Sequence, residues 1–173
     1  MATYDEITSM RDHSLLRPFL TDQEIDDGCR LAHKYRVATV CVRPSDVQRA
    51  KEILRASPVL MTTVIGFPHG STTTRIKVME AEHAIADGAR EVDVVLNAGK
   101  LKSGSHRYVE QDIKAVVELA HSKHVAVKVI FENCYLTDQE KLRCVGSASN
   151  LALISRRHQP VLALKVPRTA ISP

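Results

Sequence analysis

The stretch EVDVVLN, residues 91–97, decides the fold class of this 173-residue chain. It is a short run of aliphatic residues interrupted by one carboxylate, Asp93. Successive strand residues point to opposite faces, so Asp93 faces away from Val92 and Val94. The valine-rich run is typical of a strand buried on both faces in a parallel sheet. A charge is unusual in such a strand and calls for a partner or a function.

Similar runs recur along the chain on both sides of this stretch and are separated by helical patterns. We expect strands in MRDHSLL (10–16), VATVCV (37–42), VLMTTVIG (59–66) and VAVKVIFE (125–132). The helix signals are Thr21 with Glu24 as a capping box, Ser45 opening the next helix, Gly88 ending another, and Thr137 starting the last. This alternation indicates an α/β fold of βαβ units, which both an open doubly wound sheet and a (β/α)₈ barrel satisfy.

Polar residues lie within or at the ends of several of these strands, among apolar neighbours. They are Asp12, Cys41, Asp93, Asn97 and Lys128. Taken singly, a strand Asp or Lys is as well explained by a structural ion pair. A barrel instead gathers such groups into one site at the carboxyl ends of its strands. A buried carboxylate beside a buried amine suits proton transfer or imine chemistry on a carbonyl compound.

Composition excludes several other classes of function. No apolar run approaches the roughly 20 residues that span a bilayer, and the first residues have no signal-peptide core, so we expect a soluble cytoplasmic protein. The four cysteines lack metal-site spacing. The net charge of +4 is spread among acids with few aromatic residues, which favours a small anionic ligand over nucleic acid.

Four segments carry a resemblance to a known family. They are DHSLLRP (12–18), ATVCVRPSDVQRAKEIL (38–54), VIGFPHGSTTTRIKVMEAEHAIADGAREVDVVLNAGKLKSG (64–104) and VAVKVIFENCYLTDQEKLR (125–143). These segments resemble the class I deoxyribose-phosphate aldolases. The resemblance implies a (β/α)₈ barrel, no metal or organic cofactor, and a sugar phosphate as the binding partner. It also implies reversible cleavage of 2-deoxy-D-ribose 5-phosphate to glyceraldehyde 3-phosphate and acetaldehyde through a lysine Schiff base.

The resemblance also assigns roles to individual residues. Asp93 in EVDVV would be the proton donor and acceptor, and Lys128 in VKVI would add positive charge beside the reactive lysine. Asp12, Ser14 and Cys41 would line the substrate pocket, with Ser14 standing where the family more commonly has Thr.

The resemblance stops at Arg143, because no stretch like KTSTGFG, which carries the family's Schiff-base lysine, follows. The sequence predicts five strands, whereas a complete barrel has eight. The chain is also shorter than the roughly 250 residues of a typical barrel. A nucleotide sequence that encodes residues 156–165 can be chosen among the synonymous codons so that, read one base out of frame, it encodes KTSTGFGTE. We therefore expect a partial aldolase barrel over 1–143 and an out-of-frame tail over 144–173.

Two consequences follow for the chain as written. It would lack its Schiff-base lysine and be inactive, and the alternative to an aldolase is a fragment that binds a small phosphate or a partner chain. A barrel missing three strands also leaves sheet edges unpaired, so we expect homo-oligomers or aggregation.

Overall fold

The computed structural model describes residue 3 and residues 7–142, and the expected tail over 144–173 lies outside them. The described strands are β1 (Asp12–Leu15), β2 (Thr39–Val42), β3 (Leu60–Ile65), β4 (Glu91–Val95) and β5 (Ala126–Ile130). They form one sheet in the order β1-β2-β3-β4-β5, and every neighbouring pair is parallel. All five strands predicted from the sequence are confirmed.

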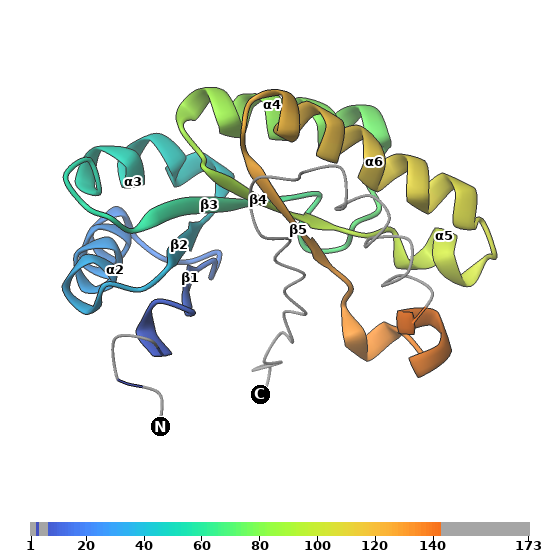
Figure 1. Ribbon diagram of the computed structural model, residues 1–173, viewed down its shortest axis with the longest axis horizontal. Helices are drawn as coiled ribbons and strands as arrows, with labels where there is room; N and C mark the ends of the chain where they lie inside the picture. The colour runs from blue at the N-terminus through green and yellow to red at the C-terminus, as the bar shows by residue number, and fades with distance from the viewer. Residues whose placement is uncertain (1–2, 4–6, 143–173) are drawn as a thin grey trace.

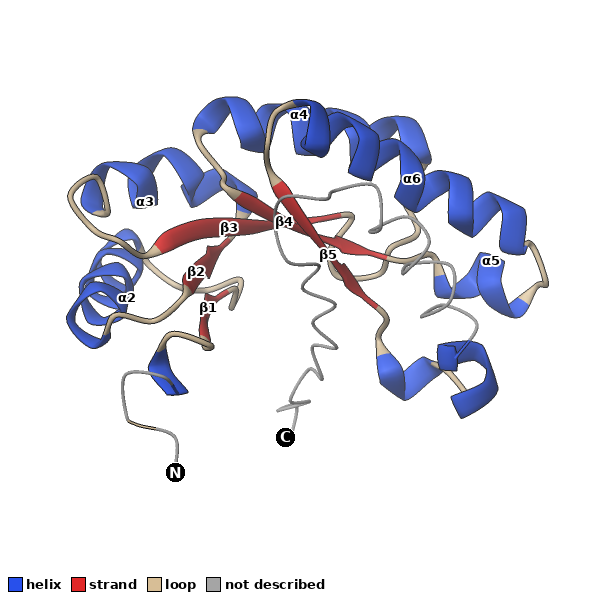
Figure 2. Ribbon diagram, in the orientation of Figure 1, coloured by secondary structure: helices blue, strands red, loops and turns tan. Residues whose placement is uncertain are grey.

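The helices that connect the strands cover one face of this sheet (Figures 1 and 2). They are α2 (Asp22–Tyr35), α3 (Val47–Ile53), α4 (Thr74–Asp87), α5 (Ala98–Lys102) and α6 (His106–Ser122), with short 3₁₀ turns η1 (Pro44–Asp46) and η2 (Asn133–Tyr135). A doubly wound sheet reverses its strand order and carries helices on both faces. The sequential order with helices on one face is instead that of consecutive units of a barrel.

Most helix boundaries follow the predicted capping signals. The Thr21 hydroxyl accepts from the Glu24 amide while the Glu24 carboxylate accepts from Thr21, which completes the predicted capping box of α2. Gly88 ends α4 with a left-handed φ of 118°. Thr137 caps the last described helical segment, accepting from the Glu140 amide.

The prediction that Ser45 opens a helix was wrong. Ser45 lies inside η1, and α3 begins two residues later at Val47. The cause is local, because Arg43 Nε donates to the Asp46 carboxylate at 2.6 Å and closes the segment into a tighter turn.

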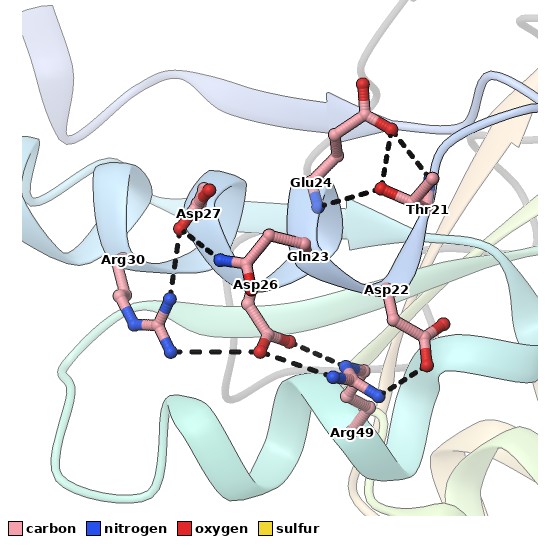
Figure 3. Close-up of polar contacts among 8 residues, drawn as sticks. All are labelled: Thr21, Asp22, Gln23, Glu24, Asp26, Asp27, Arg30 and Arg49. Carbon is pink, nitrogen blue, oxygen red and sulfur yellow. Dashed lines mark hydrogen bonds and ion pairs between the residues drawn. The ribbon is translucent and has the colours of Figure 1, made fainter.

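A network of ion pairs joins the exposed sides of α2 and α3 (Figure 3). Arg49 of α3 donates to Asp26 at 2.6 Å and to Asp22 at 2.8 Å, both on α2. Arg30 extends the network along α2 to Asp26 and Asp27. Water and salt screen ion pairs at the surface, so the network adds little to the stability of the fold.

The two faces of the sheet differ in chemistry. The face toward the helices, which we call the helix face, is apolar: Val40, Val42, Ile65, Val92 and Val94 are buried there in two clusters with residues of the covering helices. The opposite face, which we call the inner face, carries the other half of each strand. In register it presents Asp12, Ser14, Thr39, Cys41, Leu60, Thr62, Val64, Glu91, Asp93, Val95, Ala126, Lys128 and Ile130.

One buried ion pair lies behind the helix face. Lys77 of α4 and Asp112 of α6 are both fully buried, and Lys77 Nζ lies 2.5 Å from Asp112 Oδ2. Lys77 also donates to the carbonyl oxygen of Val95 at 2.8 Å, and Thr74 donates to the second carboxylate oxygen of Asp112. The pair thus fastens α4 and α6 to the carboxyl end of β4.

Candidate active site

A cluster of charged side chains occupies the inner face. Lys128 of β5 donates to Asp12 of β1 at 2.9 Å and also to Glu91 of β4. Lys128 and Glu91 are buried, and the Asp12 side chain is 19% exposed. Asp12 and Lys128 lie on the first and last described strands, 116 residues apart. Their contact means that the sheet curves enough for side chains of its two outer strands to meet across the inner face.

Asp93 belongs to this cluster. It is fully buried on β4, two residues beyond Glu91 and therefore on the same face. In the sheet register it lies directly beside Lys128. The predicted proton-transfer residue and the predicted supporting lysine are thus neighbours on adjacent strands.

The electrostatics of Lys128 favour its charged form. Burial by itself lowers the pKa of Lys128, but hydrogen bonds to Glu91 and Asp12 and the nearby charge of Asp93 outweigh it and raise that pKa above the ordinary lysine value. Burial raises the pKa of Glu91, an effect that its hydrogen bond to Lys128 opposes. Lys128 therefore carries a positive charge at neutral pH.

The three predicted pocket residues are placed differently. Asp12 is in the cluster, where Thr39 Oγ1 donates to its second oxygen at 2.6 Å. Ser14 and Cys41 lie opposite each other in the register of β1 and β2, two residues nearer the carboxyl ends of these strands than Asp12 and Thr39. Cys41 is fully buried with Val64, Val95 and Ile130, whereas Ser14 is exposed. The described structure thus gathers Asp12, Asp93 and Lys128 and sets Ser14 and Cys41 beside them.

A cavity adjoins the carboxyl ends of β1, β2 and β3. It is lined by Leu16, Arg43, Pro44, Val64, Phe67 and Glu80. Val64 packs against Cys41, so the cavity borders the inner face. In barrels the carboxyl ends of the strands are where ligands bind. Arg43 is held in its wall by Asp46 and by the carbonyl oxygen of Pro18.

Sequence reasoning missed two members of the cluster, Glu91 and Thr39. A signal for Glu91 was present, since it precedes Asp93 by two residues and must share its face. Nothing in the sequence singles out Thr39, whose contact with Asp12 depends on the pairing of β1 with β2.

Together, the sequential parallel strands, the helices on one side and the charged inner face identify the described region as part of a (β/α)₈ barrel. Comparison with known proteins narrows the class. Residues 3–153 match the model of the DeoC/LacD family aldolases, and the chain belongs to this family.

Individual relatives agree with this assignment. Deoxyribose-phosphate aldolase of Rhodopirellula baltica is 47% identical over 140 residues, which cover 81% of this chain and 58% of the relative. The enzyme of the same name from Thermococcus gammatolerans is 46% identical over 140 residues, covering 80% and 62%. The chain therefore spans about three fifths of the length of these curated relatives.

Solved structures match as well. A structure from Coccidioides immitis superposes with a TM-score of 0.83 at 38% identity, covering 87% of this chain and 58% of that one. Deoxyribose phosphate aldolase of Aeropyrum pernix superposes with a TM-score of 0.79 at 27% identity, covering 86% and 62%. In the part of the chain that the structure describes, no helix is both long enough and apolar enough to cross a membrane.

Proposed function

We propose that this chain provides the acid/base part of a deoxyribose-phosphate aldolase site. The reaction is the reversible cleavage of 2-deoxy-D-ribose 5-phosphate to glyceraldehyde 3-phosphate and acetaldehyde. The observation that carries the proposal is the buried Asp93 beside the charged Lys128 on the inner face of the sheet. The names of the relatives supply the substrate.

The chemistry requires an amine that attacks the sugar aldehyde at C1; the adduct then loses water to form an iminium ion. The iminium draws in the electrons of the C2–C3 bond, which breaks to an enamine of the two-carbon fragment and glyceraldehyde 3-phosphate. Asp93 takes the proton from the hydroxyl at the bond that breaks and returns one to the enamine carbon. Water then releases acetaldehyde from the amine.

Lys128 is unsuited to be the attacking amine, because an ammonium ion has no lone pair. It donates to two carboxylates, and they hold it in the charged form. Its role in the proposal is a fixed positive charge that keeps the reactive lysine neutral and nucleophilic. That lysine comes, by resemblance, from a segment like KTSTGFG on the following strand. Asp12, Ser14 and Cys41 contact the substrate.

A chimaera tests the proposal. Residues 1–143 are joined to the carboxyl-terminal part of the Rhodopirellula baltica enzyme, and cleavage of 2-deoxyribose 5-phosphate is followed. We expect an active chimaera in which Asp93→Asn lowers kcat by about 10² to 10⁴. The control Glu110→Gln, at an exposed position on α6, leaves kcat unchanged. Full activity of the Asp93→Asn chimaera would contradict the assignment.

A second function applies to the chain on its own, which we propose binds a sugar phosphate without turnover. Among the described strands, Lys128 is the one lysine on the inner face, and it is ion-paired. Equilibrium binding of 2-deoxyribose 5-phosphate without release of acetaldehyde is the expected result. We also expect self-association, as in the tetrameric Aeropyrum pernix enzyme, and light scattering at several concentrations measures it.

A further inference from the structure

The charge cluster on the inner face contains more acid than base. Asp12, Glu91 and Asp93 surround a single ammonium group, that of Lys128. Glu91 is not among the residues to which the sequence or the proposed reaction gives a role. Its side chain is only 8% exposed, and the one hydrogen bond recorded for it is to Lys128.

We propose that Glu91 is a positioning residue that, together with Asp12, holds Lys128 as a fixed ammonium beside Asp93 and keeps it from forming an imine itself. The use of that charge in catalysis rests on the proposed function. The protonation state of Lys128 is independent of that function, because it can be measured without any substrate.

The geometry supports this role. Glu91 lies at the start of β4, on the face that also carries Asp93, so its carboxylate reaches Lys128 from the amino-terminal side of the site. Asp12 reaches the same Nζ from β1 and is itself fixed by Thr39. Two strands therefore direct acceptors at one amine.

The other buried lysine of the described structure gives a useful contrast. Lys77 is paired with one carboxylate, Asp112, and donates also to a backbone carbonyl, on the side of the sheet away from the inner face. Such a pair fastens helices and needs no second acid. Lys128 instead has two acids as acceptors and a third as its register neighbour, which is more than a structural pair requires.

The experiment follows the ionisation of Lys128 by NMR in the full chain labelled with ¹³C at lysine Cε. The Lys128 signal is assigned by its loss in Lys128→Arg. In the wild type we expect its pKa to lie above the ordinary lysine value, and in Glu91→Gln we expect it to fall by at least about one unit. Glu91→Asp should restore part of the shift, and Glu110→Gln should leave Lys128 unchanged.

If Glu91 only filled space and had no electrostatic hold on Lys128, its replacement would lower stability without moving this pKa. Equal Lys128 titrations in the wild type and Glu91→Gln would therefore overturn the inference, as would a wild-type pKa at or below the ordinary value. If Glu91→Gln does not fold, Asp12→Asn tests the second carboxylate in the same way. The wild-type titration needs no variant and still tests whether the Lys128 pKa lies above the ordinary value. Failure of the aldolase chimaera would refute the proposed function and leave this measurement unaffected.

Discussion

The helix face and the inner face of the sheet are built from alternate residues of the same five strands, yet they serve different ends. Val92 and Val94 pack under the helices, while Asp93 between them faces a buried ammonium. The helix face removes apolar surface from water and so stabilises the fold. The inner face buries charge, which costs free energy unless the charges are paired. We therefore expect substitutions on the helix face to change mainly stability, and substitutions on the inner face to change also the chemistry of the site.

The largest effect is expected at the buried pair behind the helix face. Asp112→Ala leaves the ammonium of Lys77 buried with no carboxylate partner, and we expect a loss of about 3–5 kcal/mol in the free energy of unfolding. The double variant Lys77→Met/Asp112→Leu removes both charges and should recover most of this loss. Urea unfolding measures both variants. A small effect of Asp112→Ala would show that the pair is dispensable.

Lys128→Met is the matching test on the inner face. It leaves three carboxylates near one another without a cation, and we expect a loss of about 3 kcal/mol at neutral pH. Burial raises the pKa of Glu91 and its hydrogen bond to Lys128 opposes this, so removal of the cation should raise that pKa further in the folded state. The loss should therefore be largest above the pKa of Glu91 and shrink as the pH falls and its carboxylate takes up a proton. Urea midpoints across the pH range decide this. A loss independent of pH would contradict the charge account.

Neighbouring residues of β4 provide a smaller and more direct contrast. Val94→Ala on the helix face should cost about 1.5–3 kcal/mol, because a fully buried side chain loses packing. Asp93→Asn on the inner face should change stability by less, since it removes one of three like charges. Its main effect is expected on kcat of the chimaera, which should fall by about 10² to 10⁴. Equal losses of stability would mean that Asp93 is structural.

The smallest effect is expected at the start of α2, remote from both faces. Thr21→Ala removes the cap and should cost about 1 kcal/mol. Hydrogen bonds from the Thr21 amide and hydroxyl lower the pKa of Glu24. The contribution of Glu24 is therefore present above its unfolded-state pKa and is lost as the pH falls through its lower folded-state pKa. The loss in Thr21→Ala should persist at low pH, because the Thr21 hydroxyl accepts from the Glu24 amide at any pH. Thermal unfolding of the wild type and Glu24→Gln should instead converge at low pH, and persistent separation of that pair would contradict the role of the Glu24 carboxylate in the capping box.

The strands could be predicted because each is a short aliphatic run between helical patterns, and the sequence motif drew attention to Asp93 and Lys128. Their adjacency could not, because it depends on the register of β4 with β5. The helix start at Ser45 was mispredicted because a local salt bridge outweighed the capping preference. Lys77 and Asp112 read as ordinary helix residues, and only the packing of α4 on α6 brings them together.

Both the proposed function and the role of Glu91 require Lys128 to serve as a charge and not as a nucleophile. Reaction of the chain with acetaldehyde and borohydride, followed by peptide mapping, tests it most directly. We expect Lys128 to remain unmodified while exposed lysines such as Lys34 and Lys123 react. Ethylation of Lys128 ahead of those surface lysines would mean that its amine is neutral and nucleophilic, and would contradict the account.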